Sequence, residues 1–288
     1  MSAALKIDDS AFSLPAMYEE SPLFDQLCLN AEQTLESAEI TTAQKAQILT
    51  NYSLYFRQTF ITQKLAASQG RAILDGPFKG QKLFPNGALT GSSLPRLMGN
   101  YEYELHGWLN EISTIAYDTI INVGSAEGYY AVGLARLIPS ARIYAAEILP
   151  NMRELTQLAA KDNGVEERVT VVGGISSPNL NGLIRGRTLV FCDIEGAEKT
   201  LLDPSLAPKL VQADMLVELH EVYEPGLIEL LKSRFAETHT YRQVEPGDGT
   251  PILPSYTQAW SDIDRTLLTF EGRAGYTPWG WWQSKSAG

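Results

Sequence analysis

Two short runs of ionisable residues have the types and the spacing that proton-transfer chemistry needs. Residues 193–198 read Asp-Ile-Glu-Gly-Ala-Glu and follow an apolar run, while residues 218–221 read Glu-Leu-His-Glu and end another. Because side chains alternate along a strand, Glu218 and His220 are expected on the same face. Burying an unpaired charge is costly, so carboxylates gathered at adjacent strand ends indicate a functional site.

A glycine turn between two apolar segments lies further toward the N-terminus. The run DTIINVGSAEGYYA at 118–131 predicts a buried strand, a tight loop and then a helix. Gly124 and Gly128 let the backbone turn sharply and approach a ligand, and the helix behind them offers unpaired N–H groups. By itself such a loop is weak evidence, because small residues at this position often serve packing alone.

The next strand strengthens the functional interpretation of that loop. ARIYAAEIL at 141–149 is predicted to be a strand that finishes on Glu147, about 20 residues beyond the glycines. In doubly wound folds an acidic residue at this position binds the ribose of a nucleoside. The loop and Glu147 together predict a nucleoside-type cofactor site.

The remaining elements are those needed to position these residues. From residue 118 onward, predicted strands and helices alternate, which is typical of a mainly parallel sheet covered on both faces. The expected strands are 119–122, 141–149, 168–174, 186–196, 215–223, 239–245 and 279–284. Helices are expected behind the glycine loop, from Pro150 to a cap at Asn163-Gly164, from about 225 to 236 and near 262–270.

The first third of the chain is predicted to be helical, with one long loop. Ser21-Pro22 resembles a helix start, and Thr41 with Gln44 resembles a capping box. The second helix should bury a stripe made of Ile48, Leu49, Tyr52, Tyr55, Phe56, Ile61 and Leu65. Residues 75–97 contain too many Gly, Pro, Asn and Ser for a regular element, and residues 99–112 have roughly helical spacing. We therefore divide the chain into a helical extension with a covering loop at 1–97 and a cofactor-binding domain at 98–288.

Composition excludes several classes of protein. The chain has 288 residues, 44% of them hydrophobic, and a formal net charge of −11, which argues against a nucleic-acid partner. Cys28 and Cys192 are the only cysteines, so neither a disulfide framework nor a zinc site is indicated. The N-terminus lacks the features of a signal peptide and no apolar run has the length of a membrane span, so we expect a cytoplasmic protein without a membrane partner.

Taken together, these motifs resemble a known family. The runs DTIINVGSAEGYYAVGLA and FCDIEGAEKTLL, with the acidic end of the second strand, look like the FkbM-like branch of class I S-adenosylmethionine-dependent methyltransferases. The most specific part is Asp-Ile-Glu-Gly-Ala-Glu, since FkbM-like proteins carry Asp-x-Glu-Gly-Ala-Glu after strand four. The resemblance covers about residues 98–285. It implies a Rossmann-like class I methyltransferase sheet, mainly parallel with seven strands and helices on both faces, with a helical N-terminal extension.

The resemblance also implies S-adenosyl-L-methionine as the cofactor and assigns residues to it. The loop beneath its methionine part would be formed by Asn122, Gly124, Ser125, Ala126 and Gly128. Glu147 would bind the two ribose hydroxyls, Ile148 would pack against adenine, and Gly174 and Ile175 would lie beside the adenine edge. Many class I enzymes have an acidic residue after strand three, whereas this chain reads Val-Gly-Gly-Ile-Ser-Ser. The adenine contact is then left to backbone groups or Ser176.

Catalytic roles follow from the same resemblance, because methyl transfer to a hydroxyl group needs alignment and a base. His220 is the better base, since its unperturbed pKa is about 6.5. Asp193 would face the methyl group or the cofactor's amine and orient the imidazole or accept the proton itself, with Glu218 beside it. For Asp193 we favour this role over that of a helix cap, whereas for Glu198 we favour the cap.

Two other uses of these groups are left open. Mg²⁺ held by carboxylates is a rival, but it prefers an octahedral shell of oxygen ligands, which His220 fits poorly, so we predict no metal. Alternatively, Glu218 and His220 only pair with Arg or Lys on a neighbouring loop.

We therefore predict an S-adenosylmethionine-dependent O-methyltransferase acting on a small hydroxylated molecule, such as a sugar or a secondary metabolite. One alternative is a nicotinamide-dependent oxidoreductase, although Ala126 stands where its loop needs a second glycine. Another is a catalytically inactive methyltransferase-like binding module. The acceptor and the oligomeric state, for which a homodimer is one option, are left open.

Overall fold

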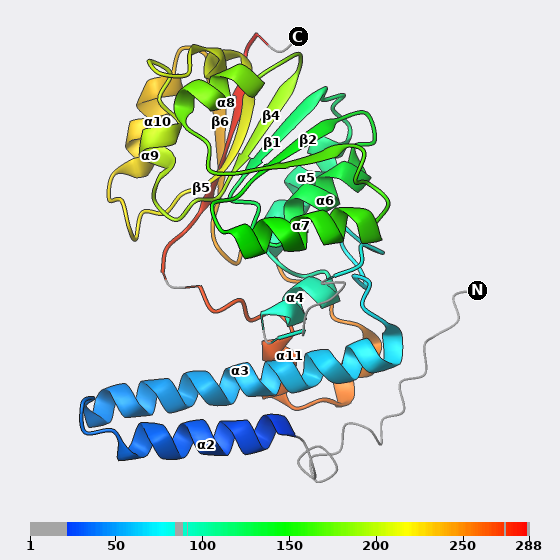
Figure 1. Ribbon diagram of the computed structural model, residues 1–288, viewed down its shortest axis with the longest axis vertical. Helices are drawn as coiled ribbons and strands as arrows, with labels where there is room; N and C mark the ends of the chain where they lie inside the picture. The colour runs from blue at the N-terminus through cyan, green and yellow to red at the C-terminus, as the bar shows by residue number, and fades with distance from the viewer. Residues whose placement is uncertain (1–21, 84–88, 91, 274, 287–288) are drawn as a thin grey trace. The chain divides into compact units, whose positions relative to one another are not determined.

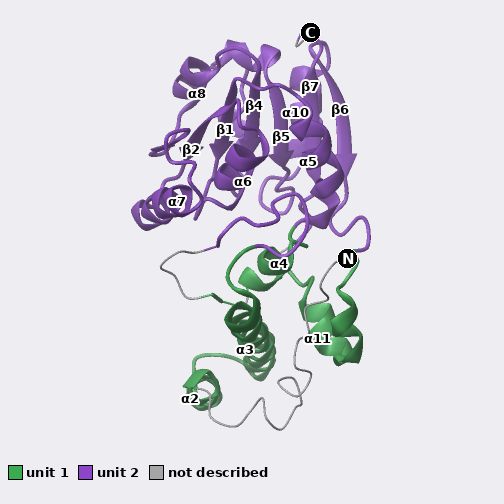
Figure 2. Ribbon diagram, turned by 90° about the vertical axis from the view of Figure 1, so that its right-hand side faces the viewer, with its two compact units in different colours: residues 1–72, 88–101, 251–272 green, residues 73–87, 102–250, 273–288 purple. Residues whose placement is uncertain are grey.

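The computed structural model describes residues 22–83, 89–90, 92–273 and 275–286, which form two compact units. The first unit comprises residues 1–72, 88–101 and 251–272, and the second comprises 73–87, 102–250 and 273–288 (Figure 2). The chain therefore enters each unit more than once. The boundary at residue 97 stays a prediction, and the sequence analysis did not foresee that 251–272 belongs to the helical unit.

The second unit is built on a seven-stranded sheet with the order β3-β2-β1-β4-β5-β7-β6. Its strands are β1 Thr119–Val123, β2 Arg142–Ala146, β3 Val169–Val172, β4 Thr188–Cys192, β5 Asp214–Glu218, β6 His239–Val244 and β7 Trp279–Ser284. All neighbours pair in parallel except β7, which runs antiparallel to both β5 and β6. The strand order changes direction between β1 and β4, which is where ligands bind in such sheets.

Helices cover both faces of this sheet, as Figure 1 shows. On one face lie α5 His106–Ser113, α6 Tyr129–Leu137 and α7 Pro150–Asp162, with η2 Tyr103–Leu105 before α5. On the other lie α8 Ser177–Leu183, α9 Glu198–Leu201 and α10 Leu227–Phe235, with η3 Pro208–Gln212 before β5. Trp281 and Trp282 are both buried, so the two adjacent indoles serve packing. The predicted Rossmann-like fold of class I methyltransferases is confirmed.

Four predicted strands are wrong at their C-terminal ends, because β2, β3, β4 and β5 each leave the sheet at least two residues earlier than predicted. β2 ends at Ala146, one residue before Glu147, and β4 ends at Cys192. Beyond β4, Glu195 and Gly196 have φ values of 54° and 102°, which an extended strand does not allow. Beyond β5, the carbonyl of His220 accepts N–H groups from residues 223 and 224, which makes a turn there. The site residues therefore lie on loops just past the strands.

The first unit is helical and contains the described part of the N-terminal extension. Its elements are α2 Pro22–Glu36, α3 Thr42–Gln69, α4 Ser93–Met98, η4 Ser255–Ala259 and α11 Asp262–Leu267. The capping box is confirmed, since the backbone N–H of Gln44 bonds to Thr41 Oγ1 and the N–H of Thr41 bonds to Gln44 Oε1. An Arg57–Asp264 ion pair of 2.7 Å joins α3 to α11. The predicted cap Ser21 lies outside the described residues.

Two predictions for this unit need correction. The buried stripe of α3 is right for Phe56, Ile61 and Leu65. It is wrong for Ile48, Leu49 and Tyr52, which are half-buried, and for Tyr55, whose side chain is 43% exposed, because within the unit only the C-terminal half of α3 is closely covered. The loop expected at 75–97 ends in the short helix α4, whose apolar residues are buried. Residues 84–88 and 91 of that loop lie outside the described residues. Helical structure after it begins at Tyr103, since Glu102 has a left-handed backbone.

In the ranges that the structure describes, no helix combines the length and the apolar character needed to cross a membrane.

Candidate active site

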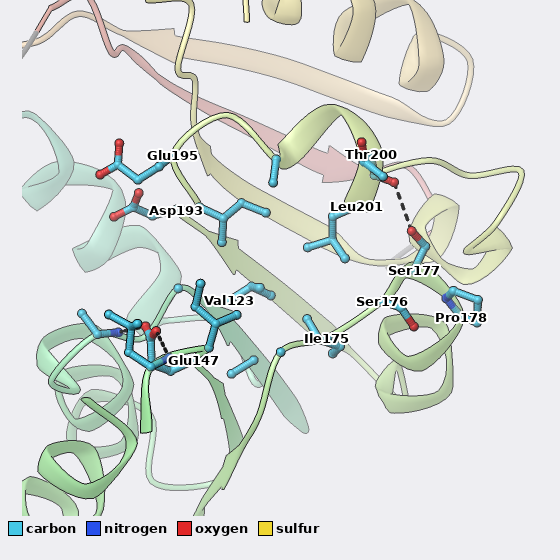
Figure 3. A pocket seen from close by; sticks show the side chains of 18 of the residues that line it. Val123, Glu147, Ile175, Ser176, Ser177, Pro178, Asp193, Glu195, Thr200 and Leu201 are labelled. Carbon is cyan, nitrogen blue, oxygen red and sulfur yellow. Dashed lines mark hydrogen bonds between the residues drawn. The ribbon is translucent and has the colours of Figure 1, made fainter. Parts of the chain in front are cut away.

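A cavity of about 750 Å³ opens at the carboxyl ends of β1, β2 and β4, where the strand order changes direction. Its walls come from the loops after these strands and from α8 and α9 (Figure 3). Glu147 lies on one side of the cavity, while Asp193 and Glu195 lie at another end with their carboxylates pointing the same way. The cavity thus lies at the edge of the sheet where the sequence placed a ligand.

The glycine loop after β1 packs tightly against the end of β4. Gly124 has a φ of +78°, and a Cβ atom there would come within 1.6 Å of the Asp193 carbonyl oxygen. At Gly128, which precedes α6, a Cβ atom would lie 3.1 Å from Thr156. Both glycines therefore have a packing reason, in addition to any contact with a ligand.

The predicted cofactor residues of this loop separate into two groups. Gly124 and Ala126 line the cavity, whereas Asn122, Ser125 and Gly128 are not among its lining residues. The Asn122 amide and the Ser125 hydroxyl are buried and have no hydrogen-bond partner in the described part of the chain. Their place in the structure is behind the cavity wall.

Glu147 directly follows β2, and two backbone N–H groups fix its carboxylate. Its Oε2 accepts the N–H of Ala126 at 2.9 Å, and its Oε1 accepts the N–H of Leu149 at 2.8 Å. An ionised carboxylate offers about four acceptor positions, so two remain for a ligand. The geometry fits a ribose diol, because the carboxylate is fixed by backbone groups and still faces the cavity.

The wall opposite Glu147 is largely apolar. Ile148, whose side chain is 74% exposed, lies beside Gly174, and both line the cavity together with Ile175. Leu201 and Leu206 complete this wall, and the sequence analysis did not find them, because apolar residues in a short helix and the loop after it look like ordinary packing. An apolar wall of this kind suits a nucleoside base.

The junction between α8 and α9 also borders the cavity. Ser177 donates a hydrogen bond to the carbonyl of Thr200 at 3.1 Å, drawn as a dashed line in Figure 3. Ser176, proposed from the sequence as an adenine contact, lines the cavity too, and its side chain makes no capping hydrogen bond to α8. Ser176 is therefore a cavity residue whose hydroxyl group is not used to cap the helix.

The ionisable residues of the two sequence runs lie together. His220 is buried, and its Nε2 lies 3.7 Å from Asp193 Oδ1, 3.4 Å from Glu195 Oε2 and 3.5 Å from Glu218 Oε2. Of the three carboxylates only that of Glu195 is largely exposed, at 73% of its side chain. Glu195 is the third residue of the run at 193–198, and the sequence assigned it no role in the reaction.

Glu198 has a different role from the helix cap favoured from the sequence. Its Oε1 lies 2.8 Å from His220 Nδ1 and also accepts the N–H of Ile194. α9 begins at Glu198 itself, and the residue before it, Ala197, makes no side-chain cap. Glu198 therefore contacts the imidazole directly. The only signal for this contact in the sequence is that Glu198 lies five residues after Asp193.

Burial shifts the protonation of this cluster. Desolvation, with the nearby charges of Glu102 and Asp193, raises the pKa of Glu218 to about 10. Desolvation also raises the pKa of Asp193, although a hydrogen bond with Glu218 and the charge of His220 oppose the rise. For His220, burial lowers the pKa, but the hydrogen bond to Glu198 and the surrounding carboxylates outweigh it, so the pKa lies above its usual value. At neutral pH, Glu218 is therefore protonated.

Further charged residues surround Glu218. Arg273 lies 2.5 Å from Glu104 Oε1 and 4.0 Å from Glu218 Oε1, and the hydroxyl of Tyr130 donates to the carboxylate of Glu102. The sequence assigned no chemistry to Arg273. Its positive charge lies next to the carboxylates of Glu104 and Glu218 and offsets part of their negative charge.

A metal ion is a second use of the cluster that the geometry admits. Asp193, Glu195 and His220 each offer a ligand atom within 4.8 Å of the others. One imidazole and two carboxylates form a mixed set that suits transition metals better than Mg²⁺, which takes oxygen ligands in an octahedral shell. The residues therefore fit Mg²⁺ poorly.

No family model matches the sequence, and no curated protein matches it either. Among solved structures, the chain is similar to the O-methyltransferase TomG from Streptomyces achromogenes in complex with S-adenosylmethionine, with 18% identity over 70% of this chain and 82% of that one and a TM-score of 0.41. It is also similar to an O-methyltransferase from Bacillus cereus in complex with S-adenosylhomocysteine, with 13% identity, coverage of 79% and 90% and a TM-score of 0.42. An rRNA methylase from Streptococcus thermophilus gives 12% identity, coverage of 63% and 96% and a TM-score of 0.44. At these values the function must be argued from the site itself.

Proposed function

We propose that this protein is an S-adenosylmethionine-dependent methyltransferase that methylates a hydroxyl group of a small molecule. The observation that carries the proposal is the position of Glu147. Its carboxylate faces the same cavity of about 750 Å³ whose other end is formed by Asp193 and Glu195, next to His220. A carboxylate suited to a nucleoside and a cluster suited to proton transfer thus share one cavity.

Seven residues of the cavity would hold the cofactor. Glu147 binds the ribose hydroxyls, and the loop containing Gly124 and Ala126 lies beneath the methionine part. Ile148 and Ile175 pack against adenine, with Gly174 and Leu201 in the same wall. Asn122, Ser125 and Gly128 support this loop from behind the wall. When bound, S-adenosylmethionine supplies an electrophilic methyl group.

The side chains around His220 would handle the proton that the acceptor loses. His220 accepts the proton from the acceptor hydroxyl at Nε2 as the new O–C bond forms and the S–C bond breaks. Asp193 stabilises the imidazolium that results. Glu218 is protonated at neutral pH and therefore adds no negative charge to the cluster.

The negative charges at this end of the cavity limit which charge the acceptor can carry. Glu195 is exposed and Asp193 is partly exposed, so an anionic group brought to His220 would be repelled. We therefore propose a neutral or cationic hydroxylated acceptor, such as a sugar or a secondary metabolite, and no nucleic acid. A cytoplasmic location and a homodimer stay predictions.

Calorimetric titration of the purified protein with S-adenosylmethionine, and in parallel with NAD⁺ and NADH, tests the cofactor. Binding of S-adenosylmethionine alone is the expected result, and it justifies a screen for methylation of neutral, cationic and phosphorylated hydroxylated compounds. Binding of a nicotinamide cofactor alone would favour the oxidoreductase alternative. Binding of S-adenosylmethionine without turnover of any class of acceptor would favour the inactive binding module.

A further inference from the structure

The tautomer of His220 decides whether its ring can accept a proton from a substrate. A neutral imidazole carries its proton on one nitrogen and a lone pair on the other. Nε2 is the nitrogen that lies 3.4–3.7 Å from Asp193, Glu195 and Glu218, and the first two of these residues line the cavity, so Nε2 is the nitrogen turned toward that end of the cavity. His220 can serve as a base there only if the neutral ring holds its proton on Nδ1.

Glu198 is placed to impose that tautomer. Its Oε1 lies 2.8 Å from Nδ1 of His220, and an ionised carboxylate can only accept a hydrogen bond. The same oxygen accepts the N–H of Ile194 at 3.2 Å, which fixes the carboxylate relative to the loop after β4. The side chain of Glu198 is completely buried, so it cannot turn away into solvent.

We propose that Glu198 is a positioning residue, which holds the proton of neutral His220 on Nδ1 and aims the lone pair of Nε2 at the reacting end of the cavity. The inference deepens the proposed function and rests on it for its catalytic consequence. The tautomer itself can be measured without an acceptor or a cofactor.

A purely structural role accounts poorly for Glu198. Its second oxygen, Oε2, is buried and has no hydrogen-bond partner among the described residues. A buried carboxylate with an unsatisfied oxygen costs stability, and a glutamine of the same shape would fill the space without the charge. The carboxylate is therefore best explained by what it does to His220.

Nitrogen-15 NMR of the histidine rings, recorded at alkaline pH where imidazoles are neutral, tests the proposal. The chain has three histidines, and His239 provides an internal reference, because its Nε2 lies 2.8 Å from the carbonyl of Ala213 and must therefore be the protonated nitrogen. His106→Gln assigns the third ring. We expect His220 to show the opposite pattern from His239, with protonated Nδ1 and unprotonated Nε2. The same pattern in both rings would overturn the proposal.

The variant Glu198→Gln tests whether Glu198 is the cause. A glutamine can donate to Nδ1, so the Nε2–H form of His220 should gain population while His239 stays unchanged. Glu224→Gln is the matched control, since it removes a carboxylate that pairs with Lys199 at the surface and should leave His220 unchanged. An unaltered His220 in Glu198→Gln would contradict the proposal, and if that variant does not fold, the wild-type tautomer decides.

Calorimetry on the same samples separates this inference from the proposed function. Absent binding of S-adenosylmethionine would overturn the proposed function and leave the measured tautomer valid. Normal binding with the wrong tautomer would overturn the role of Glu198 alone.

Discussion

The carboxylate of Glu198 lies 2.8 Å from Nδ1 of His220, although Glu198 begins the helix α9 that follows β4 and His220 lies in the turn after β5. Because Nδ1 is engaged by a buried group, Nε2 is the only ring nitrogen left to face the cluster of Asp193, Glu195 and Glu218. In the proposed reaction this contact leaves Nε2 to act as the base, which is the basis of the first prediction.

His220→Gln should reduce methyl transfer about 10²–10⁴-fold, the usual contribution of a general base, while leaving the affinity for S-adenosylmethionine nearly unchanged. The wild-type rate should rise with pH, because the base must be neutral to act, and the midpoint should lie above the ordinary histidine value of 6.5 since the pKa of His220 is raised. The measurements are turnover of an acceptor found by the screen, its pH profile and calorimetry.

His239→Gln is the control for that experiment, since His239 lies at the start of β6 and is bound by a backbone carbonyl. It should leave both the maximal rate and the pH profile unchanged. A His220→Gln enzyme with wild-type turnover would remove His220 from the reaction and leave Asp193 as the base.

The sequence predicted the seven strands, the helices α6, α7 and α10 and the meeting of Asp193 with His220, because apolar periodicity and strand alternation are local signals, but it did not predict α8. It did not predict that Glu198 contacts His220, since this contact depends on how the short helix α9 and the turn after β5 pack together. The role of Arg273 was missed for a similar reason. Its partner Glu104 lies far away in the sequence and becomes a neighbour only through the fold.

Glu147→Gln should weaken the binding of S-adenosylmethionine about 10–100-fold, because hydrogen bonds to a charged group are worth about 1.5–3 kcal/mol. The variant keeps one oxygen to accept a backbone N–H but loses the second of the two hydrogen bonds from Ala126 and Leu149, so part of the lost affinity comes from the altered loop. Calorimetry measures the affinity, and Glu154→Gln on the exposed surface of α7 is the matched control. Equal affinities in the two variants would argue against a ribose contact at Glu147.

Glu218→Gln should make the protein more stable at alkaline pH. The folded-state pKa of Glu218 is raised from 4.5 to about 10, so the folded protein holds this proton more tightly than the unfolded chain. Its favourable contribution is fully present below the unfolded pKa and is lost as the pH rises toward the folded pKa. The variant avoids this loss, so its advantage over the wild type should grow between about pH 5 and pH 9.

Thermal melts at several pH values measure this difference, and each 1 kcal/mol corresponds to about 2–4 °C in Tm. Glu154→Gln again serves as the control, because its exposed carboxylate should give a difference that does not depend on pH in this range. A Glu218→Gln difference that is constant with pH would mean that Glu218 is ionised in the folded protein.

Gly124→Ala should cost about 2–5 kcal/mol in the free energy of unfolding. The new Cβ atom would lie 1.6 Å from the Asp193 carbonyl oxygen, and the backbone at φ +78° disfavours any side chain. Gly164→Ala is the control, since its φ is +66° with no atom within 4 Å of the new Cβ, so only about 1–2 kcal/mol is expected. Denaturant unfolding of both variants measures the difference, and equal costs would mean that the loop can move away from β4.

Removal of divalent metals should leave methyl transfer unchanged, because the proposed base needs the lone pair of His220 Nε2 for the proton. Zn²⁺ or Mn²⁺ added in excess should inhibit, since Asp193, Glu195 and His220 offer ligand atoms within 4.8 Å of one another and a bound ion would occupy Nε2. Glu195→Gln should relieve this inhibition, while Glu224→Gln, which alters a surface pair with Lys199, should not. The assay is turnover after chelation and after titration with each metal. Loss of activity on chelation, with recovery on adding Mg²⁺, would instead assign these side chains to a catalytic metal and end the case for His220 as the base.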